Sequence, residues 1–189
     1  GMPDRADNTA IANESWIDKA VRVAKAFFAN WGDDHISDDS QTSAKNNSSV
    51  ITQIIVDNRR LVFTADAGIQ ALEYAANQIE SCISGAELTF IQIPHHGSKR
   101  NIGPTVLNRL IGNPVIEGEK TGVTAIVSTA KSGEPKHPRK AVLNAFTHRG
   151  AKVLATRGQG IRHYHDAPER SGWLSLPAEP YHYNYDEEV

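Results

Sequence analysis

The chain has 189 residues, of which 39% are apolar and 22% charged, and its formal net charge is −2. This length predicts one domain over residues 1–189, large enough to bury a core. The near-neutral charge gives no footprint for nucleic acid, although a small local patch stays compatible with it. The sequence has no apolar run near the roughly 20 residues of a spanning helix, and residues 1–15 lack the apolar stretch of a signal peptide. Cys82 is the single cysteine, which excludes a disulfide framework, and we expect a cytoplasmic protein without membrane contact.

The first predicted element is an amphipathic leading helix over residues 14–31. Its apolar residues, among them Ile17, Ala24 and Phe27, recur at steps of three and four along the chain. A polar loop follows over residues 32–48, with four Asp, one His and several Ser and Asn. Because almost nothing in this segment could pack, we expect a solvated loop or a partly disordered linker.

The rest of the chain alternates strands with helices. We expect a hairpin of residues 50–56 and 61–64, a helix over 69–83, a strand over 88–93, a helix over 104–111, a strand over 123–127, a helix over 138–149, and short strands at 153–155 and 161–164. Residues 166–189 carry Trp173 and three of the five Tyr, and predict an irregular tail that packs over the body. This order predicts an α/β domain with a mixed β-sheet flanked by helices.

Two groups of polar side chains follow predicted strands. Asp66 stands between a strand and a helix, so it either lies at the rim of the sheet, where ligands bind in α/β folds, or N-caps the helix. His95 and His96 follow the next strand, and imidazole is a common metal ligand. Adjacent residues in an extended chain point to opposite sides, so only one of the two would face a given metal.

Three segments, taken together, resemble the metallo-β-lactamase superfamily. They are Asn46-Asn47-Ser48-Ser49-Val50, then Leu61-Val62-Phe63-Thr64-Ala65-Asp66-Ala67, then Ile91-Gln92-Ile93-Pro94-His95-His96-Gly97-Ser98. Ser128 at the end of a strand and His137-Pro138 before a helix fit the same order. Within the superfamily, the chain is most similar to the hydrolase domain of competence proteins that handle DNA uptake (the ComEC type). The resemblance covers about residues 46–165, and assigns residues 49–165 to the superfamily-like part.

This resemblance implies a di-metal hydrolase with an αββα sandwich fold that holds zinc or manganese and acts on a phosphodiester or related ester. Asp66 matches the carboxylate that bridges the two metal ions. His96 matches a metal-binding histidine, with His95 as the weaker match. The resemblance places four further residues near the substrate or around the metal ligands: Asn47, Ser98, Lys99 and His137.

The sequence departs from the superfamily at its main metal-binding signature, HxHxDH, which is absent. His35 stands among aspartates, but with a different spacing. It could replace only one further ligand, a histidine that the family carries between HxHxDH and the bridging carboxylate. The chain therefore resembles the second half of the duplicated fold. Since catalytic zinc usually has three protein ligands plus water, we expect a weakly bound or absent metal, and weak or no activity of the chain alone.

The alternative is a non-catalytic module that binds or assembles. A half-fold leaves an open sheet edge, which a second copy, a partner chain carrying the first half, or the tail from Trp173 to Tyr185 would have to cover. A third interpretation, an unrelated α/β binding protein, requires that the side chains of Asp66 and His96 do not converge.

The basic residues near the C-terminus have a plainer interpretation. His163 and His165 alternate with Arg162 and Tyr164, which is typical of a solvated strand face. Lys152, Arg157 and Arg162 could form a modest basic patch, but a solvated surface is the favoured interpretation. Nucleic acid stays a candidate substrate that the net charge does not indicate.

Overall fold

The computed structural model describes residues 31, 33–82, 85–131 and 137–183. A five-stranded sheet with the order β1-β2-β3-β4-β5 organises this part of the chain. The first pair is antiparallel and the other three pairs are parallel. The predicted α/β class with a mixed sheet is therefore confirmed. The strands are β1 (Thr52–Val56), β2 (Arg59–Phe63), β3 (Glu87–Gln92), β4 (Thr124–Val127) and β5 (Lys152–Ala155).

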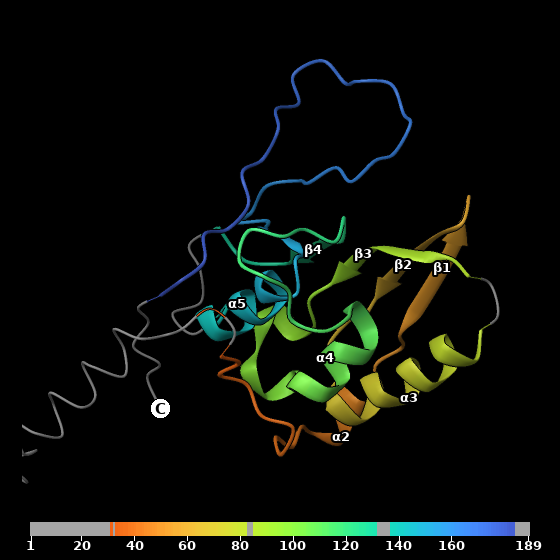
Figure 1. Cartoon of the computed structure of the whole chain (residues 1–189), viewed down its shortest axis with the longest axis vertical. Helices are drawn as coiled ribbons and strands as arrows, with labels where there is room; N and C mark the ends of the chain where they lie inside the picture. Colours follow the sequence, from red (N-terminus) through yellow and green to blue (C-terminus); the bar gives the residue numbers. More distant parts are fainter. Residues whose placement is uncertain (1–30, 32, 83–84, 132–136, 184–189) are drawn as a thin grey trace, which may run out of the picture.

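Helices cover one face of this sheet, as Figure 1 shows. The helix that follows β3 has the predicted bounds, and those before and after it differ by one or two residues at their ends. No helix in the described part of the chain is long and apolar enough to cross a membrane. The helices are α2 (Ala44–Asn47), α3 (Ile69–Ser81), α4 (Pro104–Ile111) and α5 (Lys140–His148), with short 3-10 turns η1 (His95–Gly97) and η2 (Lys99–Asn101).

The hydrophobic core lies between the sheet and these helices. Alternate strand residues point to one face, so Val62, Ile91, Ala125 and Val153, which lie in register across four strands, are all buried in it. The predicted apolar stripe of α3 is confirmed, because Ile69, Leu72 and Ala76 lie on one face of the helix and are buried in this core.

The opposite face of the sheet carries no helix. Leu61, Phe90 and Thr124 lie in register on it, and residues 159–176, here called the strap, arch over this side (Figure 1). The fold is therefore a sheet with helices on one side and an irregular segment on the other.

The predicted strand over residues 161–164 is wrong. Arg157 and Gly158 have φ angles of 45° and 74°, which turn the chain away from the sheet after β5. The outer edge of β5 is instead reached by the tail, because the backbone N–H of Glu179 donates to the carbonyl oxygen of Val153 at 2.8 Å. Residues 161–164 consequently belong to the strap and form no ladder.

Most described residues of the predicted polar segment 32–48 are exposed, as expected for a solvated loop, but two of its aspartates bind the body of the protein. Arg149, which is fully buried, donates two hydrogen bonds to the Asp34 carboxylate, at 3.0 and 2.5 Å. Asp38 accepts from the N–H and hydroxyl of Thr105 at the first turn of α4. Polar side chains here replace the apolar contacts that the segment lacks. The predicted helix over 14–31 lies outside the described residues except for its last residue.

The predicted packing of the tail on the body holds for its last described residues, whereas most residues from 168 to 178 are exposed. The Tyr181 ring lies 4.8 Å from the Trp31 ring. The Asn144 side-chain amide donates to the carbonyl oxygen of His182 and accepts from its backbone N–H. Trp31 in turn donates from its indole N–H to the carbonyl oxygen of Val115 at 2.8 Å. These contacts join both ends of the described chain to α5 and the loop after α4.

Candidate functional site

The loops after β2 and β3 meet at the carboxyl edge of the sheet. The side-chain oxygen of Gln92 accepts from the backbone N–H groups of Thr64 and Ala65, at 3.1 and 3.2 Å. The Thr64 hydroxyl donates to the Gln92 carbonyl oxygen at 2.9 Å, and the His95 N–H donates to the Ala65 carbonyl oxygen at 3.0 Å. Four hydrogen bonds therefore hold the two loops in one fixed arrangement.

Left-handed backbone concentrates in these two loops. Ala65, His95 and His96 have φ angles of 48°, 44° and 54°, and Gly97 follows at 81°. A residue with a side chain in this conformation costs about 1–2 kcal/mol, so it persists only where the surroundings impose it. Such residues are enriched at active sites and ligand clamps, which makes this edge the candidate site.

His96 is oriented by the neighbouring strand. Its Nδ1 lies 2.8 Å from the carbonyl oxygen of Ser128, just after β4. A carbonyl oxygen can only accept, so Nδ1 carries the proton and Nε2 keeps a lone pair. The ring is exposed, and a metal-binding histidine has this same arrangement, with one nitrogen donating to a carbonyl and the other toward the metal.

His95 is held differently. The Asn46 side-chain nitrogen lies 2.8 Å from His95 Nδ1. Because an amide nitrogen donates, His95 Nδ1 accepts and the ring proton sits on Nε2. The rings of His95 and His96 are 6.2 Å apart and inclined at 85°. The two rings point to different sides, as predicted, but through left-handed turns rather than through an extended backbone.

His137 comes to the same edge from the segment before α5. Its ring centroid lies 6.3 Å from that of His95. The following Pro138 packs against Gly97, where an added Cβ would lie 2.8 Å from the Pro138 Cβ, and the Arg139 N–H donates to the Gly97 carbonyl oxygen at 3.1 Å. This close approach and the positive φ explain why the residue after the two histidines is glycine.

Asp66 lies exposed between β2 and α3. The N-cap of α3 is Gly68, without a side-chain hydrogen bond, so the capping role considered for Asp66 is wrong. Its carboxylate forms no hydrogen bond or ion pair with the residues that the structure describes, whereas its carbonyl oxygen accepts from the Asn101 amide at 3.0 Å. The loop is fixed by its backbone, and the carboxylate points into solvent.

The remaining predicted site residues have separate positions. The Ser98 hydroxyl accepts from the N–H of Arg100 within η2, and the Asn47 side-chain oxygen accepts from the Thr42 hydroxyl at 2.9 Å. Lys99 begins η2 and is half-buried. His35 lies between Asp34, which pairs with Arg149, and Asp38, which accepts from Thr105 at the start of α4. The loops after β2 and β3 bring Asp66, His95 and His96 to one edge of the sheet, where His137 lies next to His95.

The donor set does not make a self-sufficient metal centre. Among the described residues, no three His, Cys, Asp or Glu side chains converge in a way that could hold a metal ion. His96 has the orientation of a ligand, and Asp66 has an available carboxylate, but each stands without the further ligands that a catalytic zinc needs.

Three amide side chains that organise this edge were not predicted. Gln92 and Asn101 hold the loop after β2, and Asn46 rather than the predicted Asn47 contacts His95. Only Asn46 had a signal, because it belongs to the Asn46–Val50 segment that carries the family resemblance.

No protein-family model, no curated protein and no solved structure matches the chain. The chemistry of the carboxyl edge is therefore inferred from the geometry of its own residues. That geometry combines an oriented imidazole, a solvent-facing carboxylate and an imposed left-handed backbone.

Proposed function

We propose that the chain is the C-terminal half of a metal-dependent hydrolase of the metallo-β-lactamase fold, which acts on a phosphodiester or related ester. Asp66 and His96 would be its contribution to a zinc or manganese centre. The observation that carries this proposal is His96, whose Nδ1 donates to the Ser128 carbonyl oxygen from a left-handed backbone and so leaves Nε2 available.

The layer arrangement supports the same proposal. An αββα sandwich packs two sheets face to face, with helices outside. Here the helices lie on one face, and the other face carries exposed apolar side chains on β1 and β2, such as Ile54 and Phe63, beside the part that the strap covers. A second sheet would cover these side chains.

The proposal requires ligands from outside the described residues. A centre with two ligands binds a divalent ion weakly and generates a poor nucleophile, so the chain alone is expected to turn over little substrate. Activity would depend on a segment or partner that supplies the missing histidines.

Metal titration tests the proposed role of His96 separately from activity. Calorimetry with Zn²⁺ is expected to show a weak site on the wild-type chain, and His96→Ala and Asp66→Asn should each weaken it about tenfold or more. His163→Ala is the matched control, since His163 lies in the strap against the helix-free face of the sheet, and should leave the affinity unchanged. Equal affinities for wild type and His96→Ala would contradict the proposal.

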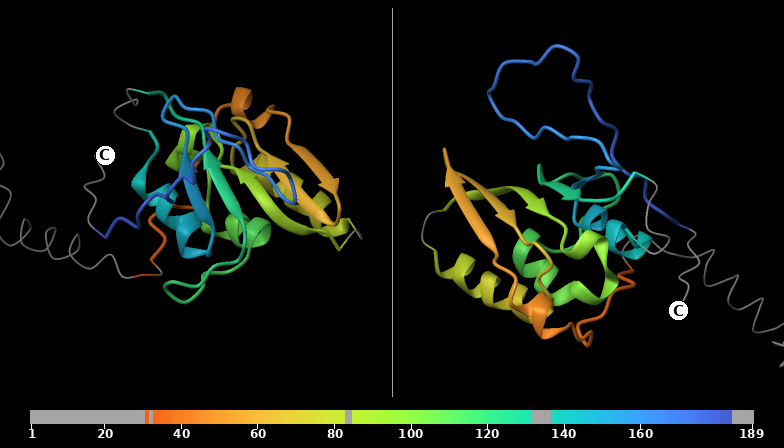
Figure 2. Two further views of the ribbon diagram at one scale, coloured as in Figure 1. Left: turned by 90° about the horizontal axis from the view of Figure 1, so that it is seen from above. Right: turned by 180° about the vertical axis from the view of Figure 1, so that it is seen from behind.

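A second candidate function, an assembly module without catalysis, is favoured by β1. This strand forms one rim of the sheet (Figure 2), and all five of its residues are exposed. Ile54, Ile55 and Val56 are between 40% and 51% exposed, and β1 contains neither charge nor proline. Edge strands that are not meant to pair are normally protected by such residues. Within the described residues, the tail reaches the β5 edge through the Glu179–Val153 hydrogen bond, and no strand pairs with the outer edge of β1.

Antiparallel pairing of β1 with β1 of a second copy would satisfy this edge without bringing like charges together. Sedimentation of the wild-type chain should then show a dimer, and Ile55→Lys should shift it to a monomer. The control is Ile116→Lys, since Ile116 is 79% exposed but lies in the loop between α4 and β4. A wild-type monomer at about 100 μM, far above typical affinities of stable dimers, would contradict self-assembly through β1.

A further inference from the structure

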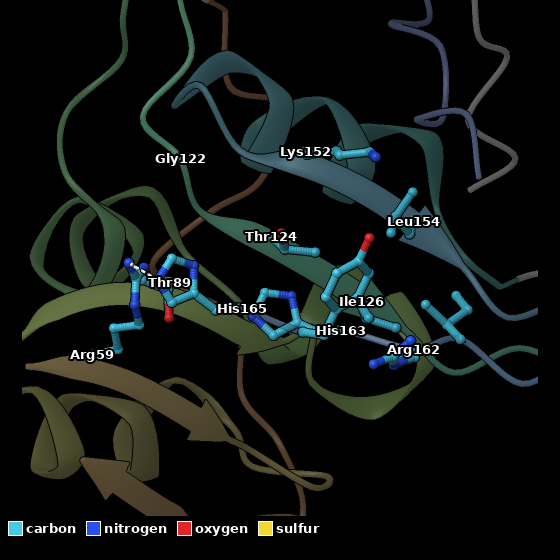
Figure 3. Close-up of a pocket in the computed structure, with 12 residues that line it drawn as sticks. Arg59, Thr89, Gly122, Thr124, Ile126, Lys152, Leu154, Arg162, His163 and His165 are labelled. Carbon is cyan, nitrogen blue, oxygen red and sulfur yellow. Dashed lines mark hydrogen bonds between the residues drawn. The ribbon is translucent and has the colours of Figure 1, made fainter. Parts of the chain in front are cut away.

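A pocket of about 320 Å³ lies between the helix-free face of the sheet and the strap (Figure 3). Arg59 reaches it from β2 and Lys152 from β5, while the strap contributes Arg162, His163 and His165. It lies over the middle and amino ends of the strands, away from Asp66 and His96 at the carboxyl edge. The pocket is therefore a separate feature of the molecule.

The lining is basic on every side. Within the described chain, no Asp or Glu lines the pocket, although five basic side chains do. The nearest acidic groups stay outside it. Asp166 pairs with His165 at 2.8 Å, but its side chain is 87% exposed, and Glu87, in register with Arg59, is also exposed.

Arg59 and His165 illustrate the electrostatic consequence. Arg59 Nη2 lies 2.5 Å from His165 Nε2, and the same His165 nitrogen lies 2.8 Å from the Asp166 carboxylate. Burial lowers the pKa of His163 below its ordinary value, and the nearby Arg59 and His165 lower it further. The pocket thus already suppresses positive charge, and an anion inside it would relieve this repulsion.

The uncharged lining residues fit an organic phosphate. The Thr124 hydroxyl comes from the sheet and can donate to a phosphate oxygen, whereas the Thr89 hydroxyl donates to the Arg60 carbonyl oxygen at 3.4 Å. Arg162 is held in place by its hydrogen bond to the Pro168 carbonyl oxygen at 2.8 Å and lies 4.4 Å from the Tyr164 ring centroid. A fixed guanidinium is a strong phosphate ligand. Ile126 and Leu154 form an apolar floor between these groups (Figure 3).

We propose that this pocket binds a small phosphate-bearing molecule. Arg59, Arg162 and Lys152 surround the pocket and attract its phosphate group, and its organic part lies on Ile126 and Leu154. The volume is at the lower end of the range for small-molecule sites, which matches a monophosphate with one ring system. This site is independent of the proposed metal centre, and of whether the chain is a hydrolase.

Calorimetry on the full chain with three probes tests the proposal: inorganic phosphate, adenosine 5′-monophosphate and adenosine. We expect saturable binding of the two phosphates, with the mononucleotide tighter, and none of adenosine. Arg59→Gln and Arg162→Gln should each weaken mononucleotide binding about tenfold, the usual loss for one charge-assisted hydrogen bond. Arg109→Gln, which removes a pair with Glu80 on the helix side of the sheet, is the matched control and should bind like wild type.

Nuclear magnetic resonance gives an independent readout. Bound mononucleotide should shift the ring signals of His163 and His165 and raise the pKa of His163, because an anion favours the protonated imidazole. Equal binding of adenosine and the mononucleotide would overturn the proposal, as would equal effects of Arg59→Gln and Arg109→Gln. A twelve-residue oligothymidylate that binds over a hundredfold more tightly than the mononucleotide would also overturn it, since the pocket would then be part of a nucleic-acid surface.

Discussion

The Nδ1 atom of His96 lies 2.8 Å from the carbonyl oxygen of Ser128, so that one contact joins the loop after β3 to the end of β4. The contact spans neighbouring parallel strands at the edge where α/β proteins place their ligands. It fixes both the direction of the ring and the nitrogen that keeps a lone pair. In the proposed function this orientation serves a cation, although the described residues do not complete a site for one.

Ala65→Gly should stabilise the protein. Ala65 is exposed and has a φ of 48°. Glycine would remove the backbone strain of a left-handed alanine, about 1–2 kcal/mol. Its greater freedom in the unfolded chain would cost about 0.5–1 kcal/mol. Urea denaturation should show a free energy of unfolding about 0.5 kcal/mol higher or more. Ala130→Gly, at an exposed position without a positive φ, is the control and should destabilise; a loss at Ala65 as large as at Ala130 would contradict the strain.

Asp66→Ala should leave the stability nearly unchanged, within about 0.5 kcal/mol, because Asp66 neither caps α3 nor pairs with a residue in the described part of the chain. Ser43→Ala is the comparison, since Ser43 does cap α2 through its contact with the Asn46 N–H and should cost about 0.5–1 kcal/mol. Thermal or urea unfolding of both variants checks this. A loss at Asp66 larger than at Ser43 would assign it a structural role.

Asp34→Ala should destabilise strongly, by about 3 kcal/mol or more, because it leaves the fully buried Arg149 guanidinium without its carboxylate partner. The Asn108 side chain and the Ala145 carbonyl oxygen still accept from Arg149 and limit the loss. Urea denaturation measures the effect. Glu80→Ala, which breaks the exposed pair with Arg109, should cost only a small fraction of it; similar losses would contradict the buried pairing.

Stability should fall as the pH drops from 7.5 to 5.5. Burial lowers the pKa of His163 and of His182 below the ordinary 6.5, and Lys140 lowers that of His182 further. The unfolded chain therefore binds protons first, so the free energy of unfolding decreases below pH 6.5. Urea denaturation at several pH values should show a shallower decrease for His163→Gln than for wild type. A free energy that rises on acidification would contradict the direction of these shifts.

The fold was largely predictable because local patterns and packing agree. The apolar stripe that contains Leu72 predicts the helix α3 from local sequence. Asp57 and Asn58, with φ angles of 47° and 59°, likewise predict the turn between β1 and β2. The errors arose where distant contacts decide. The period-two pattern from Arg162 to His165 resembles a strand, but the positive φ angles of Arg157 and Gly158 turn the chain away from β5. The contacts that hold the polar segment around Asp34 come from Arg149, far along the chain.

The candidate site was predictable in residue type and only partly in arrangement. His96 and Asp66 could be named because each follows a strand, and His137 because the family resemblance included it. The orientation of His96 depends on a backbone carbonyl, and that of His95 on Asn46, and neither contact leaves a pattern in the sequence. The basic pocket was not predicted, because it forms only when the strap folds over the sheet.

The central claim is that this chain carries only part of a metal centre. The direct measurement is elemental analysis of the purified protein, combined with a phosphodiesterase assay on bis(p-nitrophenyl) phosphate with added Mn²⁺ or Zn²⁺. We expect far less than one metal ion per chain and little or no turnover, since two candidate ligands fall short of a catalytic set. Stoichiometric metal together with robust turnover would contradict the claim.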